Sequence, residues 1–266
     1  MRVIFFGDIF GRPGREALIQ ALPDIMRREQ PDFVIANAEN IAHGMGVTKK
    51  ALSELLPFPL DCFTSGNHIF ALKEAGELLN DESYRLLRPA NWYPETPGLG
   101  VRIIEKKGKK LAVINLMGQV FMKQKVLSPF WELRRIVSEV AQETKNILVD
   151  FHAEATSEKK AFGIFADGVV SAVLGTHTHI PTADEQILSA GTAYISDVGM
   201  VGPFGSVLGL DARGVIENYL TQRYAHFEPW SGDRVEINFV VVDIDEKIGT
   251  ATAIRRERLI VQNNAI

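Results

Sequence analysis

Five short runs of β-branched and aromatic residues recur along the chain, with stretches of helical periodicity between them. The runs are 2–6, 33–36, 61–64, 147–151 and 169–174. Each is nearly continuous in apolar character instead of alternating with polar residues, which is typical of strands covered on both faces. Because strands that alternate with helical segments build layered sheets, the pattern predicts an α/β protein in which two packed sheets have helices outside.

The intervening segments predict helices at 14–29, 48–56, 70–80 and 130–144. Thr48 is a plausible N-cap, Pro13 suits a first helical position, and Pro23 is expected to kink or split the first helix. A hairpin is predicted over 101–117. Later in the chain the pattern predicts strands within 185–197, 235–245 and 249–261, and a helix at 210–224.

Size and charge exclude several classes of protein. The chain has 266 residues, 46% of them hydrophobic, and no repeat or low-complexity tract, so we expect one globular domain over 1–266. Its 29 basic and 33 acidic residues give a net charge of -4. Strong nucleic-acid binding is not expected, because it needs a clustered excess of Lys and Arg. A small anionic substrate fits this balance.

Cysteine usage and hydropathy indicate the compartment. Cys62 is the only cysteine, so neither an intramolecular disulfide nor a zinc-thiolate site can form, and a buried, inert thiol in a reducing compartment is expected. No apolar run approaches the roughly 18 residues of a membrane span, and residues 1–7 lead into Asp8 without a signal peptide. We therefore expect a cytoplasmic protein with no membrane partner.

A polar cluster follows each of the five predicted strands. The clusters lie at 7–8, 37–40, 66–68, 152 and 175–179. Ligands of open α/β sheets bind beyond the carboxyl ends of the strands, so these five segments are expected to meet at one place.

The clusters supply carboxylates, carboxamides and imidazoles, but no thiolate. These residues are Asp8, Glu39, Asn40, Asn67, His152, His177 and His179. One ion that keeps an open position for chemistry rarely needs so many ligands, whereas two ions bridged by a carboxylate use them all. Each residue alone has a structural explanation, such as capping a turn, but their conjunction predicts a metal site. Oxygen and imidazole ligands leave the choice among Mn, Fe, Ni and Zn open.

These motifs resemble the ordered motifs of the calcineurin-like metallophosphoesterases. The segments 7–15, 37–40 and 152–159 are similar to its bacterial YmdB-like branch, and the resemblance runs from residue 1 to about 215. It implies a four-layer α/β/β/α sandwich of two mixed sheets flanked by helices. It further implies a metal-dependent phosphoric diester hydrolase acting on cyclic nucleotides, with 2',3'-cyclic AMP favoured and 3',5'-cyclic AMP a second candidate. The implied cofactor is two divalent or mixed-valence transition-metal ions, with Fe or Mn favoured.

The resemblance also implies a ligand assignment. One metal would be held by Asp8, Glu39, Asn40 and His179, and the other by Glu39, Asn67, His152 and His177. Two positions depart from the wider superfamily. The superfamily has Asp-x-His at the first motif, whereas here Ile9-Phe10 follows Asp8, so one imidazole ligand is missing and Asn40 is expected to take its position. Glu39 stands where the superfamily usually has a bridging Asp.

In this interpretation a metal-bridging hydroxide attacks phosphorus, and His68 protonates the departing ribose oxygen. The alternative for His68 is that it orients Asn67 or the bridging water. Arg12, at the start of the first helix, and His43, in a Gly-rich loop, are further candidates for contacts with the substrate.

Other functions stay open from the sequence. A phosphatase or a nuclease could use the same metal centre, and a metal-binding regulatory protein could act through a partner. The expected partner is a small-molecule phosphodiester, and a homo-oligomer is compatible with the sequence. His226 is expected to be structural.

Overall fold

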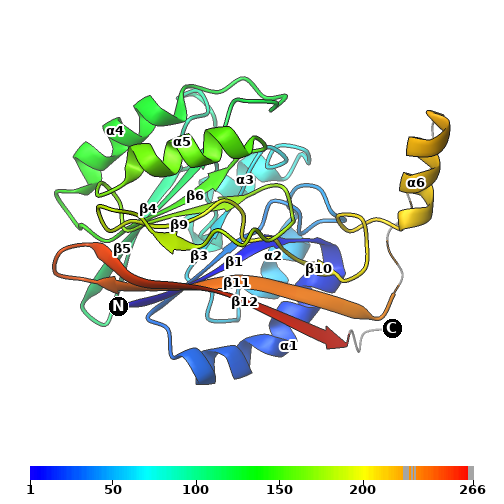
Figure 1. Ribbon diagram of the computed structural model, residues 1–266, viewed down its shortest axis with the longest axis horizontal. Helices are drawn as coiled ribbons and strands as arrows, with labels where there is room; N and C mark the ends of the chain where they lie inside the picture. The colour runs from blue at the N-terminus through cyan, green and yellow to red at the C-terminus, as the bar shows by residue number, and fades with distance from the viewer. Residues whose placement is uncertain (224–227, 229, 231, 263–266) are drawn as a thin grey trace.

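The computed structural model describes residues 1–223, 228, 230 and 232–262 and contains two six-stranded sheets (Figure 1). The first sheet has the order β12-β11-β10-β1-β2-β3 and the second β4-β5-β6-β7-β9-β8. Within each sheet four neighbouring strands are parallel and the others antiparallel, so both sheets are mixed. Their bounds are β1 (Arg2–Ile9), β2 (Phe33–Asn37), β3 (Cys62–Thr64), β4 (Val101–Lys106), β5 (Lys109–Met117), β6 (Ile147–His152), β7 (Ala172–Thr176), β8 (Gln186–Ile187), β9 (Ala193–Ile195), β10 (Met200–Pro203), β11 (Arg234–Asp245) and β12 (Thr250–Gln262).

The helices lie on the outer faces of the sheets, except for α6 (Figure 1). They are α1 (Gly11–Glu29), α2 (Lys49–Leu55), α3 (Ala75–Asn80), α4 (Pro129–Val140), α5 (Thr156–Ala166) and α6 (Ala212–Thr221), with a 3₁₀ turn at Glu82–Tyr84. Helices α4 and α5 lie side by side on one side of the molecule and α1 on the other (Figure 1). Helix α6 stands away from the body, and none of its residues is buried.

Alternate residues of β1 face different layers, as the period of a strand requires. Val3 and Phe5 pack against the second sheet, in a core that includes Leu148. Ile4 packs on the other face with helix α1, in a core that includes Leu18. Both faces of the strand are thus covered, which is why the run 3–6 is apolar without interruption.

A third apolar layer lies between the second sheet and its helices. Phe151 of β6 stacks on Phe162 of α5 with ring centroids 4.0 Å apart, and Leu133 of α4 joins the same core. Three apolar layers therefore separate two sheets and two helical faces. This is the predicted four-layer α/β/β/α sandwich.

Several local predictions are confirmed. Strands β4 and β5 form the predicted hairpin. The Thr48 side chain caps α2 by accepting a hydrogen bond from the Ala51 amide, at 3.2 Å. Cys62 is fully buried, and burial raises the pKa of its thiol to about 12, so the thiol is inert as expected.

Other boundaries are corrected. Helix α1 starts at Gly11 and runs unbroken through Pro23, which is exposed, so water can satisfy the carbonyl that proline leaves unpaired. The helix predicted at 70–80 is confined to Ala75–Asn80. The strand predicted at 169–174 starts only at Ala172, because the Val169 and Val170 amides still bond to the Ala166 carbonyl at the end of α5.

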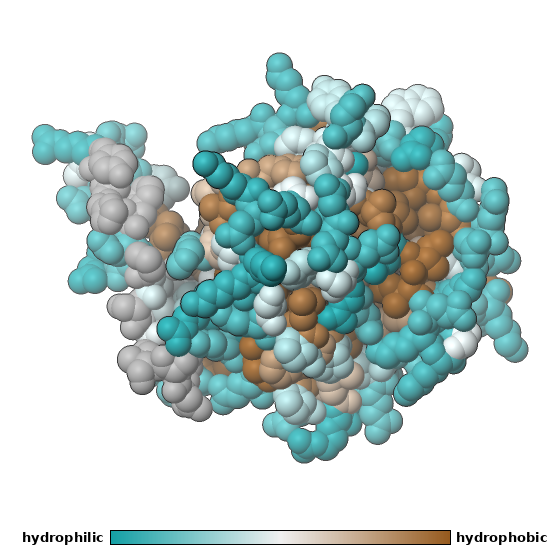
Figure 2. Space-filling view, turned by 180° about the vertical axis from the view of Figure 1, so that it is seen from behind, coloured by the Kyte–Doolittle hydropathy of each residue, from teal (hydrophilic) through white to brown (hydrophobic). Residues whose placement is uncertain are grey.

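Strand β10 and helix α5 had no sequence prediction. In α5 the charged residues Glu158 and Lys159 are buried, so the helix lacks a clean apolar face. Within the described part of the chain, no helix is both long and apolar enough to cross a bilayer. The side seen from behind is mainly hydrophilic, with some apolar patches (Figure 2). His226 lies outside the described residues.

Candidate metal centre

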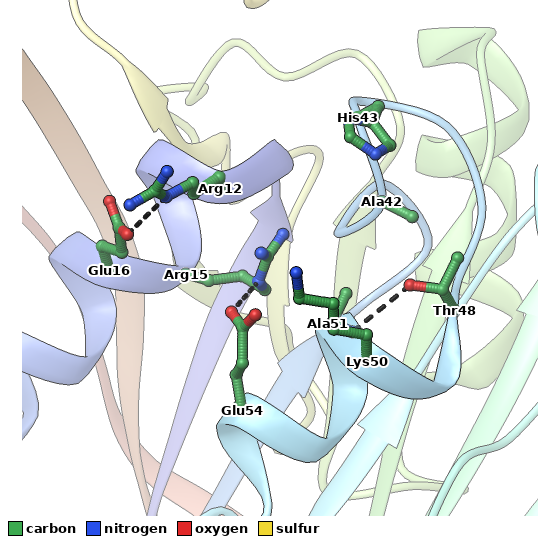
Figure 3. Close-up of a pocket in the computed structure, with 9 residues that line it drawn as sticks. All are labelled: Arg12, Arg15, Glu16, Ala42, His43, Thr48, Lys50, Ala51 and Glu54. Carbon is green, nitrogen blue, oxygen red and sulfur yellow. Dashed lines mark hydrogen bonds and ion pairs between the residues drawn. The ribbon is translucent and has the colours of Figure 1, made fainter. Parts of the chain in front are cut away.

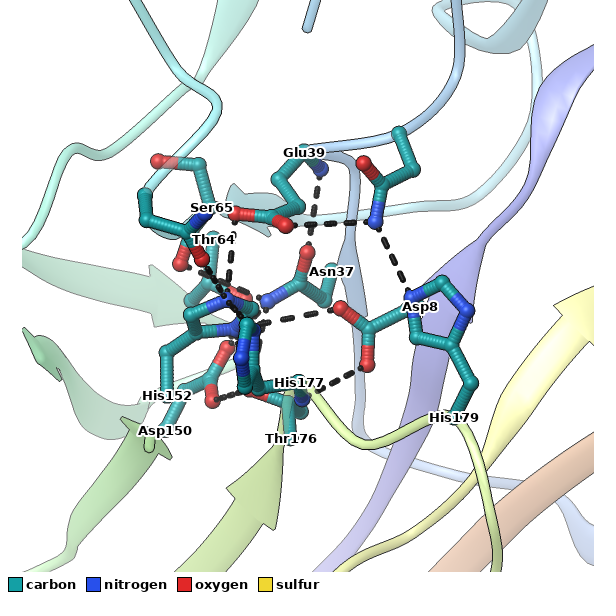
Figure 4. Close-up of polar contacts among 12 residues, drawn as sticks. Asp8, Asn37, Glu39, Thr64, Ser65, Asp150, His152, Thr176, His177 and His179 are labelled. Carbon is teal, nitrogen blue, oxygen red and sulfur yellow. Dashed lines mark hydrogen bonds and ion pairs between the residues drawn. The ribbon is translucent and has the colours of Figure 1, made fainter. Parts of the chain in front are cut away.

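The carboxyl ends of parallel strands from both sheets meet at one place (Figure 4). From the first sheet, β1 carries Asp8, and the segments after β2 and β3 carry Glu39 and Asn67. From the second sheet, β6 ends in His152, and the segment after β7 carries His177. The five predicted clusters therefore come together, as their positions after the strands imply.

The two carboxylate oxygens of Glu39 face different neighbours. Oε1 lies 3.2 Å from Asn40 Nδ2 and 3.1 Å from His68 Nδ1. Oε2 lies 3.1 Å from His152 Nε2. Glu39 is fully buried, so each oxygen is available only to this cluster. A carboxylate placed between two ligand groups has the position that a bridging ligand needs.

The first ligand group surrounds the Nε2 atom of His152. That nitrogen lies 3.0 Å from Asn67 Oδ1, 3.1 Å from Glu39 Oε2 and 3.1 Å from His177 Nδ1. Ligand atoms of Glu39, His152 and His177 all lie within 4.8 Å of one another. This group could hold a metal ion.

The second group contains Asp8, Asn40 and His179. Asn40 Nδ2 lies 3.1 Å from His179 Nε2. Asn40 directs its oxygen to His68 instead, so ligation through that oxygen requires a half-turn of the amide. Asp8 is fully buried, and its Oδ2 accepts from the His177 amide at 3.1 Å. Among the described residues, Asp8 Oδ1 and His179 Nδ1 have no hydrogen-bond partner, and Oδ1 lies 3.8 Å from His152 Nδ1. Because a buried carboxylate oxygen without a hydrogen bond is costly, Asp8 Oδ1 fits a site for a cation.

The ionisation state differs among the ligand residues. Burial would lower the pKa of His152, but Glu39, Asp8 and Asp150 outweigh it and raise that pKa to about 9, so this ring is protonated until a cation displaces its proton. Burial lowers the pKa of His177 to about 3 and that of His179 to about 4, so both rings are neutral at physiological pH. Burial alone would raise the pKa of Glu39, but His152 and His68 outweigh it and hold that pKa well below its usual range. Burial raises the pKa of Asp8 well above its usual range. A bound cation would favour ionised Asp8.

A hydrogen-bonded pair behind His152 fixes the orientation of its ring. The Thr176 hydroxyl donates to Asp150 Oδ1 at 2.7 Å, and Thr176 Oγ1 lies 2.8 Å from His152 Nδ1. Since Thr176 donates its hydroxyl proton to Asp150, it accepts from Nδ1–H, and Nε2 is the nitrogen that a cation could bind in place of its proton. The sequence prediction missed this pair. The residue that could have revealed the pair is Asp150, because it is an acidic residue inside an otherwise apolar predicted strand.

The loop that carries His177 and His179 is held in a strained conformation. Their φ angles are 101° and 64°, in the left-handed region that non-glycine residues rarely adopt. Asp197 anchors this loop by accepting from the Thr178 amide at 3.0 Å and from Lys159 Nζ at 2.7 Å. Lys159 also donates to the Thr176 carbonyl at 2.8 Å.

Replacing Lys159 by Met is expected to lower the free energy of unfolding by about 3 kcal/mol, because Asp197 would stay buried without its counter-ion. Both side chains are 1% exposed. Denaturant titration measures the effect, with Lys247→Met in the exposed β11–β12 turn as the matched control. Equal midpoints for the two variants would show that the buried pair does not anchor the loop.

Two glycines allow the backbone to approach the centre. A Cβ at Gly66 would overlap Glu39 Oε2 and the His152 ring. A Cβ at Gly175 would overlap the Ser196 carbonyl, between neighbouring segments of the second sheet. Glycine is therefore required at both positions by close packing instead of by backbone conformation.

The remaining predicted site residues lie in two different places, the ligand cluster and a neighbouring cavity. His68 joins the cluster, with Nδ1 2.9 Å from Asn40 Oδ1, so its side chain contacts Asn40 and Glu39 instead of Asn67. Arg12 and His43 lie outside the cluster and line a neighbouring cavity. Glu154, not among the predicted site residues, reaches His177 Nε2 at 3.0 Å.

Comparisons with known proteins show the same architecture. A model of YmdB-like proteins matches residues 4–257. A Bacillus subtilis relative named 2',3'-cyclic-nucleotide 2'-phosphodiesterase is 42% identical over 264 residues, covering 99% of this chain and 98% of the relative. The structure of a Mycoplasma pneumoniae phosphatase has a TM-score of 0.91 at 34% identity, covering 99% of this chain and 95% of that one. A Thermus thermophilus 5'-nucleotidase precursor shares the fold, with a TM-score of 0.57 at 13% identity, over 98% of this chain and 54% of its own.

Proposed function

Because the chain belongs to the family of YmdB-like proteins, we propose that it is a metal-dependent phosphodiesterase that hydrolyses cyclic nucleotides, with 2',3'-cyclic AMP favoured. The observation that carries the proposal is the convergence of two carboxylates, two carboxamides and three imidazoles from both sheets. The name of the 42% identical relative supports the substrate class. A 3',5'-cyclic nucleotide is the second candidate substrate.

The proposed ligand sets are those that the family resemblance implies. Asp8, Glu39, Asn40 and His179 would hold one ion, and Glu39, Asn67, His152 and His177 the other. Two observations support this assignment: the two Glu39 oxygens contact Asn40 and His152 respectively, and Asp8 Oδ1 has no hydrogen-bond partner among the described residues. Two such ions, Fe or Mn by family resemblance, would activate water near neutral pH and neutralise charge on the phosphoryl group.

The protein's own residues orient the reacting groups. The side chain of His68 is 31% exposed, whereas those of His152 and Glu39 are at most 1% exposed. Its Nδ1 is engaged by Asn40 and Glu39, which leaves Nε2 to give a proton to the departing ribose oxygen. Asn40 and Glu39 thereby position the ring of the proposed acid.

We also propose that residues 1–266 act as one catalytic domain. The first sheet provides Asp8, Glu39 and Asn67, and the second provides His152 and His177. Neither sheet alone contains either proposed ligand set, so the site needs both sheets together.

The test is a substrate panel with the manganese-loaded protein: 2',3'-cyclic AMP, 3',5'-cyclic AMP, bis(p-nitrophenyl) phosphate and the monoester p-nitrophenyl phosphate. Cleavage of the diesters, with the 2',3'-cyclic nucleotide fastest, is expected. Preferential cleavage of the monoester would favour a phosphatase. Metal binding without cleavage of any compound would favour a regulatory protein.

A further inference from the structure

A cavity of about 490 Å³ opens beside the proposed centre, between the start of α1, the loop after Asn40, and α2 (Figure 3). That volume lies in the range of small-molecule binding sites. Its polar side chains are Arg12, Arg15, Glu16, His43, Thr48, Lys50 and Glu54. None of these belongs to the proposed ligand sets.

The charges on the cavity wall leave a net positive balance. Arg12 Nε pairs with Glu16 at 2.6 Å, and Arg15 Nε pairs with Glu54 at 2.8 Å. Lys50 has no acidic partner among the described residues, and its amine is directed into the space between the helices (Figure 3). Three cations thus face two carboxylates in a protein whose net charge is -4. This local excess suits an anion.

Donor groups for an anion are also available there. His43 is exposed, lines the cavity from the loop after Asn40, and makes no hydrogen bond with any residue that the structure describes (Figure 3). Arg12 pairs with Glu16 through Nε, and its side chain is 69% exposed. The Arg12 guanidinium is turned toward Glu16, whereas the Lys50 amine lies beside the Arg15 guanidinium, so Lys50 and Arg15 could hold a phosphate with charged N–H groups (Figure 3).

The cavity adjoins the proposed centre but is separate from it. The Asn40 carbonyl accepts from the Gly11 amide at 2.8 Å, which joins the ligand loop to the start of α1. Phe10 lies between the two places: its ring contacts His179 edge-on at 5.8 Å, and a Cβ on Gly44 would overlap that ring. An anion in the cavity is therefore a different group from the phosphate at the ligand cluster.

We infer that this cavity binds a second phosphate of the substrate, so that the preferred substrates are nucleotides with both a 2',3'-cyclic phosphate and a 5'-phosphate group. The inference rests on the proposed phosphodiesterase function, because the cyclic phosphate is assigned to the ligand cluster. A cyclic mononucleotide without a 5'-phosphate leaves the cavity unused.

The experiment compares kcat/KM for 5'-phosphoadenosine 2',3'-cyclic phosphate with kcat/KM for 2',3'-cyclic AMP. The unmodified protein is expected to favour the first about tenfold, the effect of one charge-assisted contact. Lys50→Ala should remove most of that preference. Lys49→Ala, an adjacent exposed lysine that does not line the cavity, should retain it. Equal kcat/KM values in the unmodified protein, or equal preferences in the two variants, would overturn the inference.

A binding measurement separates failure of this inference from failure of the proposed function. Adenosine 3',5'-bisphosphate should bind about tenfold more tightly than adenosine 3'-phosphate, and only Lys50→Ala should lose the difference. This result would uphold the second phosphate site even if neither cyclic nucleotide were cleaved. Adenosine 5'-phosphate that binds through Lys50 without competing with 2',3'-cyclic AMP would show an effector site and overturn the inference.

Discussion

Glu39→Gln is expected to lower kcat for 2',3'-cyclic AMP more than about a hundredfold, exceeding the usual cost of changing a residue that only supports a metal ligand. Glu39 is the residue whose two oxygens face both ligand groups. Glutamine has nearly the same shape but offers one oxygen and no charge, so it cannot bridge two cations in the same way. Metal analysis should show less than two ions per chain.

The matched control is Glu217→Gln on the exposed helix α6, which makes the same chemical change away from the centre. It should retain full activity and metal content. Full activity in Glu39→Gln with two ions bound would contradict the bridging role and leave Glu39 as a buried hydrogen-bonding residue.

His68→Ala is expected to lower kcat for 2',3'-cyclic AMP by about 10² to 10⁴, the usual contribution of a general acid, with metal content unchanged. The effect should depend on the leaving group. Ribose alkoxide needs a proton, whereas p-nitrophenolate leaves readily without one, so bis(p-nitrophenyl) phosphate should lose much less rate. The measurement is the ratio of the two rate losses.

The alternative role of His68 makes a different prediction. Its Nδ1 contacts Asn40 and Glu39, so a residue that only positions these ligands would cost both substrates equally and weaken metal binding. His68→Gln keeps a donor near Asn40. If this variant restored the rate on 2',3'-cyclic AMP, it would contradict proton donation by His68.

Much of the architecture could be predicted because its signals are local. Uninterrupted apolar runs such as 3–6 are visible in the sequence and correspond to buried strands. The polar residues directly after those strands need only the rule that ligands bind at the carboxyl ends of parallel strands. This rule brings Asp8, Glu39 and His152 together without knowledge of side-chain packing.

The groups that support the centre could not be predicted in the same way. The Lys159–Asp197 pair joins positions 38 residues apart, and Thr176 meets Asp150 only through the register of neighbouring strands. Burial of Lys159 also hid helix α5, because a charged residue on the inner face breaks the amphipathic pattern. The cavity lined by Lys50 depends on how α1 and α2 pack against each other, which the sequence periodicity does not specify.

The most direct test of the central proposal is a metal titration of the stripped protein, followed by hydrolysis of 2',3'-cyclic AMP at each step. Activity should be absent without metal, rise with added manganese or iron, and reach its maximum at two ions per chain. Glu39→Gln should stay inactive throughout the titration. Full activity in the stripped protein, or maximal activity at one ion per chain, would contradict the dinuclear mechanism.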